Sequence, residues 1–275
     1  MIRRSQAIST LAHLALMGVL LTAGACSSDK TDEYVERPVD ELYNDGLDRL
    51  QDGENEKAAK LFDEVERQHP YSSWATRAQL MAAYAYYEDS HYDDAINALD
   101  RFIELHPGNQ NAAYAYYLKG LCYYEQIADV TRDQKNTEQA QKALQEVVRR
   151  FPGTGYARDA ALKLDLANDQ LAGKEMEVGR YYLRREDYLA AINRFRRVVE
   201  NHQTTSHVPE ALHRLTEAYL AIGVTDEAQA AAAVLGYNYP GSEWYLDSYA
   251  LLTGVNLRPE ASEGSWISRA LGSAF

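Results

Sequence analysis

The stretch Trp74–Pro107, WATRAQLMAAYAYYEDSHYDDAINALDRFIELHP, contains the pattern that decides the fold. It predicts two antiparallel helices, one ending near Glu88 and one spanning Tyr92–Leu105, with a short Asp-Ser-His break between them. Apolar residues recur at helical spacing in the second helix: Ala95, Ile96, Leu99, Phe102 and Ile103. Pro107 ends that helix because it has no backbone N–H to donate. A single hairpin cannot bury such an apolar stripe, so the pattern predicts a fold only where it recurs.

The hairpin pattern occurs five times along the chain. Each predicted second helix carries a small residue followed by apolar residues four and seven positions later: Ala58, Phe62, Val65; Ala95, Leu99, Phe102; Ala140, Leu144, Val147; Ala191, Phe195, Val198; and Ala228, Ala232, Leu235. Twelve residues after each small residue stand Pro70, Pro107, Pro152, Gln203 and Pro240. Twelve residues before it stand Gly46, Ala83, Gly179 and Thr216, and an eight-residue insertion moves this position to Gly120 in the third unit.

This register resembles the tetratricopeptide repeat, with its small residue, its Ala-x3-Phe and its terminal proline. It predicts an all-α tetratricopeptide-repeat solenoid of five helical hairpins. Residues 155–172 have an apolar stripe of their own and predict an extra helix between units three and four. That helix is either separate from the next one or continuous with it. After Pro240, four apolar residues predict a C-terminal capping helix: Trp244, Tyr245, Tyr249 and Leu252.

The N-terminus has the features of a targeting segment. Arg3 and Arg4 precede an apolar run, Leu11–Leu21, which is short for a membrane span. Small residues 23–25 lead directly into Cys26, a pattern similar to a bacterial lipoprotein signal. We expect a signal peptide over residues 1–25 and acylation of Cys26, including palmitate. An ordinary secretory signal is the alternative.

The rest of the chain divides by composition and pattern. Residues 26–38 are polar and predict a flexible tether. Repeats one to three occupy residues 39–154. The extra helix, repeats four and five and the capping helix occupy 155–255. Residues 256–275 form a C-terminal tail, in which six residues follow helical spacing: Trp266, Ile267, Ala270, Leu271, Ala274 and Phe275.

Composition and motifs argue against several functions. The formal net charge of −13 disfavours a nucleic-acid ligand, which requires a basic surface. The chain has no HExxH or Cys-x-x-Cys motif, no glycine-rich phosphate loop and no nucleophile elbow. We therefore expect no enzyme activity, no cofactor and no metal. Cys122, in a helical stretch, is predicted to be a small core residue.

Tyrosine is the unusual residue, with 21 copies against 5 phenylalanines. The resemblance to tetratricopeptide repeats implies that first helices line a concave surface, and tyrosine there suits peptide capture. The predicted groove consists of Tyr43, Arg77, Tyr84, Tyr87, Tyr114, Tyr117 and Tyr124. Arg77 is a candidate partner for a peptide's terminal carboxylate. The alternative is that packing between helices uses these rings, as we expect for Tyr86, Tyr116 and Tyr123.

A basic and aromatic cluster distinguishes the C-terminal half. It consists of Tyr181–Arg185 and Asn193–Arg197 in an otherwise acidic chain. Such a cluster could steer an acidic partner, and its alternative is a set of solvated helix faces with internal pairing.

Three stretches carry a resemblance to one family: Ala83–Tyr87 (AYAYY), Asp100–Ile103 (DRFI) before Pro107, and Tyr181–Tyr182 followed by Ala190–Arg194 (AAINR). Together with the lipoprotein signal and five repeats, they resemble the BamD (ComL-like) family, lipoprotein subunits of the outer-membrane β-barrel assembly machinery. The resemblance implies an outer-membrane-anchored scaffold on the periplasmic face, in which the N-terminal repeats receive unfolded outer-membrane proteins.

The resemblance also implies partners. The C-terminal repeats would dock a POTRA domain of the BamA-type barrel protein through Arg185 and through Asn193 with Arg194, and other Bam lipoproteins would join. The alternative function is that of a periplasmic tetratricopeptide lipoprotein acting as an adaptor in cell-envelope or cell-wall coordination.

Overall fold

The computed structural model describes residues 36–262 and 264–270. The chain divides into two units, residues 1–37 and 38–275, and of the first only Glu36 and Arg37 are described. The predicted signal peptide, Cys26 and almost all of the predicted tether therefore lie outside the described residues. Within the described part of the second unit all regular secondary structure is helical, as the sequence predicts.

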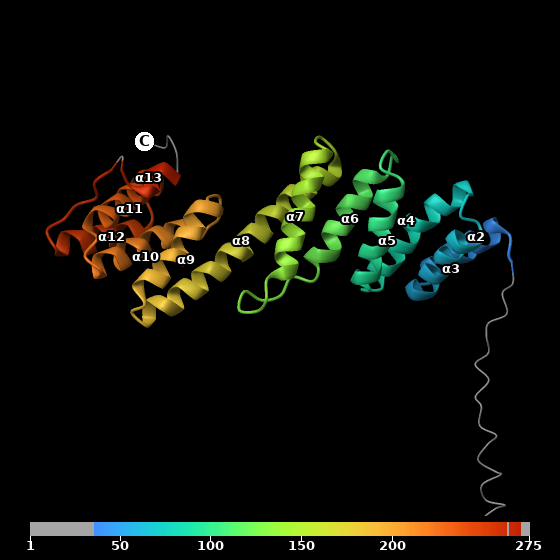
Figure 1. Ribbon diagram of the computed structural model, residues 1–275, viewed down its shortest axis with the longest axis horizontal. Helices are drawn as coiled ribbons and strands as arrows, with labels where there is room; N and C mark the ends of the chain where they lie inside the picture. The colour runs from blue at the N-terminus through green and yellow to red at the C-terminus, as the bar shows by residue number, and fades with distance from the viewer. Residues whose placement is uncertain (1–35, 263, 271–275) are drawn as a thin grey trace, which may run out of the picture. The chain divides into compact units, whose positions relative to one another are not determined.

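Ten helices form five hairpins in chain order (Figure 1): α2 (Val39–Gln51) with α3 (Asn55–Gln68), α4 (Ser73–Glu88) with α5 (Tyr92–Leu105), α6 (Ala112–Tyr124) with α7 (Lys135–Arg150), α8 (Gly155–Arg184) with α9 (Tyr188–Asn201), and α10 (Val208–Ala221) with α11 (Thr225–Asn238). Two further helices follow, α12 (Glu243–Gly254) and α13 (Trp266–Ala270).

The second helices end in one shared backbone conformation. The residue after each has φ between −135° and −124° and ψ between 44° and 55°: His69, His106, Phe151, His202 and Tyr239. The fourth unit, which has Gln203 in place of proline, follows the same path. The exit geometry is therefore a property of the repeated fold and does not depend on the proline.

Small residues set the contact between the two helices of a hairpin. A Cβ atom on Gly46 would lie 2.7 Å from Phe62, and one on Gly179 would lie 2.4 Å from Phe195. In the third unit, a Cβ on Gly120 would lie 2.8 Å from Leu144. The predicted register is confirmed at these positions, because a larger residue would hold the helices apart.

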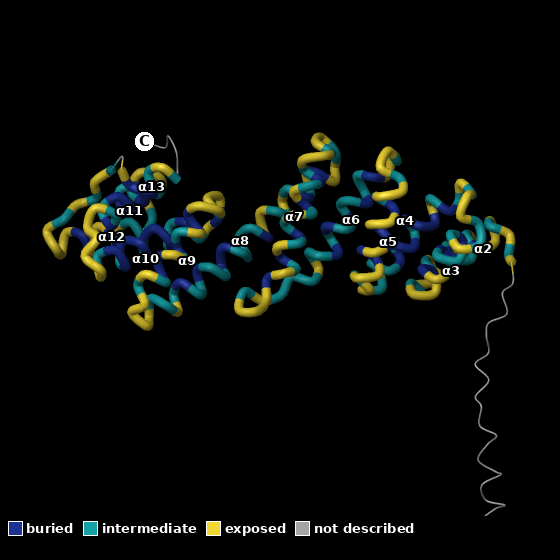
Figure 2. Tube along the Cα trace, in the orientation of Figure 1, coloured by how far each residue is buried: buried dark blue, intermediate teal, exposed yellow. Residues whose placement is uncertain are grey.

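Successive hairpins pack mainly through the second helix of one and the first helix of the next: α3 on α4, α5 on α6, α7 on α8 and α9 on α10. The first helices also meet directly. α2 contacts α4, α4 contacts α6 and α6 contacts α8, whereas α3, α5 and α7 make no comparable contacts with one another. Buried residues accordingly lie where helices meet, and exposed residues lie at the hairpin turns (Figure 2). The first helices α2, α4, α6 and α8 thus form one connected surface, on which the predicted groove residues lie.

The predicted extra helix and the first helix of unit four form one element, the 30-residue helix α8. Thr154 begins it, because its hydroxyl accepts a hydrogen bond from the Ala157 amide at 3.1 Å. The first half packs against α7 and the second half against α9. The insertion of unit three docks on its middle: Gln170 Nε2 donates to the Ala128 carbonyl at 2.7 Å.

No described helix, α8 included, is long and apolar enough to cross a membrane. The sequence prediction for Cys122 is confirmed, since this thiol is fully buried in the core between α4, α5 and α6. Burial raises the pKa of Cys122 to about 12, so the residue is an inert thiol at neutral pH.

The C-terminus closes the last two hairpins. α12 packs on α10 and α11, and the chain then returns to place α13 against α9 and α11. Within the tail, Ile267 is fully buried and Trp266 is 9% exposed. The described tail is therefore part of the core of repeats four and five.

Candidate peptide-binding and docking surfaces

Five tyrosines gather where α4, α6 and the start of α8 meet. We call Tyr84, Tyr87, Tyr114, Tyr117 and Tyr156 the tyrosine cluster. The ring of Tyr156 lies 5.6 Å from that of Tyr114 and 5.4 Å from that of Tyr117, between centroids. The phenols of Tyr84 and Tyr87 lie near enough to Tyr114 to act on its ionisation. The cluster spans three first helices, and all five rings are only partly buried.

Burial raises the pKa of four phenols of this cluster, those of Tyr84, Tyr87, Tyr114 and Tyr117. Burial raises the pKa of Tyr87 to about 12, and the nearby Glu125 carboxylate adds to the shift. Burial also raises the pKa of Tyr117, whose hydroxyl donates a hydrogen bond to Asp159. Glu88 acts in the same direction on Tyr84. The cluster is therefore an aromatic surface with polar tips and an acidic rim, suited to apolar and aromatic side chains of an extended peptide.

Tyr43 and Arg77 form a separate group around Trp74. The Tyr43 ring lies 4.9 Å from Trp74 and 5.4 Å from Phe62, between centroids, so packing uses much of it. The Arg77 guanidinium lies 6.0 Å from the Trp74 ring centroid. No carboxylate of the described residues forms an ion pair with Arg77. Tyr84 follows Arg77 by two helical turns, about 10 Å along α4.

Tyr124 lies apart from the cluster, with the Lys163 ammonium 5.6 Å from its ring centroid. Tyr156 is a member of the cluster that the repeat pattern does not predict. The one feature that could have predicted its place in the cluster is its position: Tyr156 follows Gly155 at the start of α8, a helix that packs beside α6. Of the seven predicted groove residues, the structure brings four together, and Tyr43, Arg77 and Tyr124 lie outside this cluster.

Packing between helices uses other tyrosines, as predicted. Tyr86 donates a hydrogen bond to Asp63 at 2.6 Å across the α3–α4 contact. The Tyr116 ring lies 5.4 Å from Phe151, between centroids. The alternative, that packing between helices uses the tyrosine rings, therefore holds for Tyr86 and Tyr116, and in part for Tyr43.

The predicted docking residues occupy two places on the α8–α9 hairpin. Arg185 is exposed at the turn, donates to the Tyr181 hydroxyl at 2.9 Å and lies 3.5 Å from Asp187. Arg194 pairs with Glu175 at 3.2 Å, near the middle of α8. Because Glu175 precedes Arg185 by ten residues, the two arginines stand about 15 Å apart along the helix axis. Asn193, beside Arg194, is exposed.

Glu175 is shared between two arginines, since Arg197 also lies 3.4 Å from it. One carboxylate thus faces two guanidinium groups, so the surface where α8 and α9 meet here has more positive than negative charge. Arg184 is exposed and forms no ion pair with the described residues, so it adds to this charge. The α8–α9 hairpin therefore offers a basic surface in an acidic chain.

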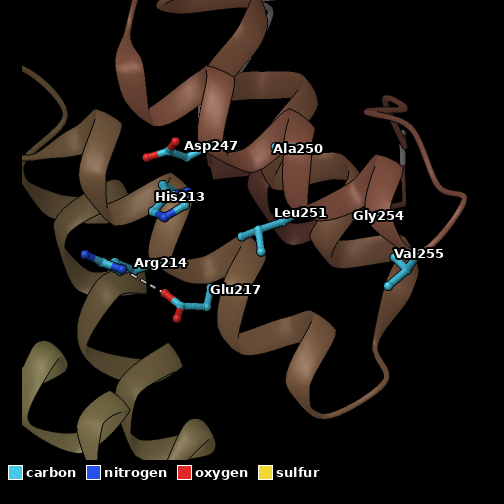
Figure 3. Close-up of a pocket in the computed structure, with 8 residues that line it drawn as sticks. All are labelled: His213, Arg214, Glu217, Asp247, Ala250, Leu251, Gly254 and Val255. Carbon is cyan, nitrogen blue, oxygen red and sulfur yellow. Dashed lines mark hydrogen bonds and ion pairs between the residues drawn. The ribbon is translucent and has the colours of Figure 1, made fainter.

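A cleft of about 630 Å³ opens between α10 and α12 (Figure 3). Arg214 and Glu217, joined at 2.9 Å, line it from α10, and Leu251 lines it from α12. His213 is buried behind them, with Nδ1 2.9 Å from the Ser248 hydroxyl, and burial lowers its pKa. This cleft has an apolar wall facing an ion pair and no residue set typical of catalysis.

Metal-ligating residues do not gather in the part of the chain that the structure describes: no group of three His, Cys, Asp or Glu side chains there could hold an ion. The helices and their surfaces are those of a helical-repeat protein.

Comparison with known proteins gives the family. Residues 35–235 match the family model described as YfiO, outer membrane lipoprotein. A Caulobacter vibrioides protein named outer membrane protein assembly factor BamD is 54% identical over 261 residues, covering 94% of this chain and 86% of that protein. A Rickettsia prowazekii protein of the same name is 45% identical over 238 residues, covering 86% of this chain and 95% of that protein. The chain therefore belongs to the BamD family, as the sequence resemblance indicates.

Among solved structures, the TPR2AB domain of yeast Sti1 in complex with pHSP90 matches with a TM-score of 0.40 and 14% identity, covering 79% of this chain and 84% of that one. The tetratricopeptide protein TTC0263 of Thermus thermophilus matches with a TM-score of 0.37 and 19% identity, covering 78% of this chain and all of that one.

Proposed function

We propose that this protein is a lipid-anchored scaffold of the outer-membrane β-barrel assembly complex, facing the periplasm. The names of its BamD relatives support a role in outer-membrane protein assembly. Acylated Cys26 would supply the anchor, and the other Bam lipoproteins would be its neighbours. The two surfaces described above then take different partners.

The N-terminal surface receives unfolded outer-membrane proteins. The observation that carries this is the tyrosine cluster, because it joins α4, α6 and α8 into one aromatic surface with rings still accessible. Arg77, about 10 Å from Tyr84 and free of carboxylates among the described residues, is placed to pair with a peptide's terminal carboxylate. Tyr43 and Tyr124 extend the aromatic surface at its two sides.

The C-terminal surface docks the POTRA region of a BamA-type barrel protein. Surplus positive charge on the α8–α9 hairpin favours an acidic partner face and speeds its approach. Arg185 and Arg194 lie about 15 Å apart, so docking would span the hairpin from its turn to its middle. Asn193 adds an exposed hydrogen-bonding side chain beside Arg194.

Photo-crosslinking to a peptide that ends in an aromatic residue tests the first surface. The variants are Tyr84→Ala and Tyr87→Ala, and Tyr71→Ala is the matched control, because Tyr71 is fully exposed outside the cluster. A hot-spot tyrosine commonly contributes more than about 2 kcal/mol to binding, so crosslinking should fall at least tenfold in the cluster variants only. Equal crosslinking in all three variants, with normal melting, would place the substrate site elsewhere.

A further inference from the structure

The C-terminal tail crosses the second-helix side of the last two repeats. We call its described part, residues 257–262 and 264–270, the strap. Its path is irregular before α13, and Asn256, just before it, has a φ of 59°. Gln229 of α11 holds the strap through its side chain and its backbone: Nε2 donates to the Arg258 carbonyl at 2.8 Å, and the Gln229 backbone carbonyl accepts from the Glu260 amide at 3.3 Å.

Trp266 is the anchor of the strap. Its indole N–H donates to the Tyr219 hydroxyl at 2.8 Å, and the Arg196 guanidinium lies 4.2 Å from its ring centroid. The indole thus meets a hydrogen-bond acceptor and a cation on one surface, the two contacts a tryptophan uses best. Ile267, the next residue, is fully buried.

Polar contacts flank this anchor on both sides. The Ser265 hydroxyl donates to Glu227 of α11 at 2.6 Å, and Gln203, just after α9, donates to the Ala270 carbonyl at 3.0 Å. The strap therefore contacts α9, α10 and α11 through a short Ser-Trp-Ile sequence. A buried aromatic anchor with further contacts around it is the arrangement of a binding hot spot.

The residues that receive the strap come from other parts of the chain. Arg196, Tyr219 and Glu227 belong to hairpins four and five, whose helices pack on each other directly. The strap adds Trp266 and Ile267 to the apolar core that these hairpins form.

We propose that this surface of α9–α11 is a docking site for a short Ser-Trp-Ile peptide, and that the chain's own strap is its resident ligand, bound in cis and exchangeable with the same sequence supplied in trans. A segment linked to its site through the same chain acts at an effective concentration on the order of millimolar, which keeps the site filled while each contact remains reversible. Release of the strap uncovers the Arg196 guanidinium on α9, which keeps its charge and its ion pair with Glu200 at 2.9 Å. Occupancy of the site therefore changes how far this guanidinium is exposed on the helix that also carries Arg194.

The test uses the full chain with Trp266→Ala and Ile267→Ala together, which removes the anchor of the strap and leaves the docking site empty. We call this protein the emptied variant. A fluorescein-labelled peptide of residues 260–270, EASEGSWISRA, is titrated against this variant and against the wild type by fluorescence anisotropy. The emptied variant should bind saturably, and the wild type at least tenfold more weakly, because its own strap competes. Adding Tyr219→Phe to the emptied variant should weaken binding about two- to tenfold, since it removes the acceptor of the indole N–H. The same peptide with alanine in place of tryptophan is the matched control.

A folded emptied variant that binds the two peptides equally, or binds neither, overturns the proposal. If the emptied variant does not melt cooperatively, a second protein decides: the wild-type chain with a protease site introduced at residues 258–261. After cleavage, the strap fragment should remain bound in gel filtration and exchange with excess labelled peptide. Unfolding on cleavage, or a fragment that never exchanges, shows that the strap is a fixed part of the core and overturns the proposal.

Discussion

Gly179 on α8 lies directly against the phenyl ring of Phe195 on α9: a Cβ at Gly179 would stand 2.4 Å from Cε1 of that ring. Phe195 is fully buried, so the ring has little room to move away. The same relationship joins Gly46 to Phe62 at 2.7 Å in the first hairpin. These contacts set the distance between the two helices of a repeat.

Gly179→Ala should therefore destabilise the protein. Overpacking a core costs about 1–3 kcal/mol, and only about 1 kcal/mol returns from the better helix propensity of alanine. We expect a melting temperature lower by about 2–8 °C, measured by circular dichroism. Gly108→Ala is the control, because a Cβ there meets nothing within 4 Å. Equal melting of the two variants would mean that the Phe195 ring repositions without cost.

The register of the repeats was predictable because it is local. The spacing of 16 residues from Gly46 to Phe62 and from Gly179 to Phe195 follows from helix period and a short turn. Contacts between hairpins depend on how helices pack on one another, which periodicity does not encode. Tyr117 meets Asp159 across 42 residues, and Trp266 meets Tyr219 across 47.

Site residues were predictable only in part for the same reason. Helical spacing places tyrosines on the faces of α4 and α6, but the membership of Tyr156 depends on where α8 begins beside α6. The partner of Arg194 was likewise hidden, because the apolar register does not tell which polar side chains of α8 and α9 meet. Arg194 is in fact paired with Glu175, as the alternative interpretation of the basic cluster allowed.

The raised pKa values of two tyrosines predict that the folded protein loses stability at alkaline pH. Burial raises the pKa of Tyr87 to about 12, and burial also raises that of Tyr117, above the ordinary value of 10.0. A folded-state pKa above the unfolded value leaves stability intact below pH 10, because the phenol is neutral in both states there. Stability falls as pH rises through the folded-state pKa, because the unfolded chain ionises first.

Thermal melts between pH 8 and 11.5, with tyrosinate absorbance recorded in parallel, check this. The melting temperature should drop steeply above pH 10, and a fraction of the tyrosines should ionise only on unfolding. The double variant Tyr87→Phe with Tyr117→Phe is the control, and its drop should be shallower. Identical pH profiles for variant and wild type would show that these phenols are not protected in the folded state.

Cys26→Ala should release the protein from the outer membrane into the soluble periplasmic fraction. The small residues before Cys26 predict acylation there, and several acyl chains at one site give stable anchoring. Cys122→Ala is the matched control, since Cys122 is buried in the core and should not affect fractionation. A Cys26→Ala protein that stays with the outer membrane after its partners are depleted would show that another feature anchors it.

Arg194→Glu should uncouple the protein from the BamA-type barrel protein, provided that Arg194 docks this partner as proposed. The substitution has two effects that must be separated. It removes a positive charge from the docking face, and it places a second carboxylate beside Glu175, now 3.2 Å from the Arg194 guanidinium. Arg197 remains next to Glu175, and the pair is partly exposed, so the loss of fold stability should stay within about 1 kcal/mol.

The charge-swapped variant, Arg194→Glu with Glu175→Arg, separates the effects of Arg194→Glu, because it restores the internal ion pair and leaves the docking position negative. Removing one member of a desolvated charge pair costs about 2–5 kcal/mol of binding. Co-purification with the barrel protein from detergent-solubilised membranes should therefore be lost in both variants, while circular dichroism melts stay near the wild type. If the swap restores co-purification, Arg194 acts by holding Glu175 and α8 in place, and the docking contact must be sought at Arg184 or Arg185 near the hairpin turn.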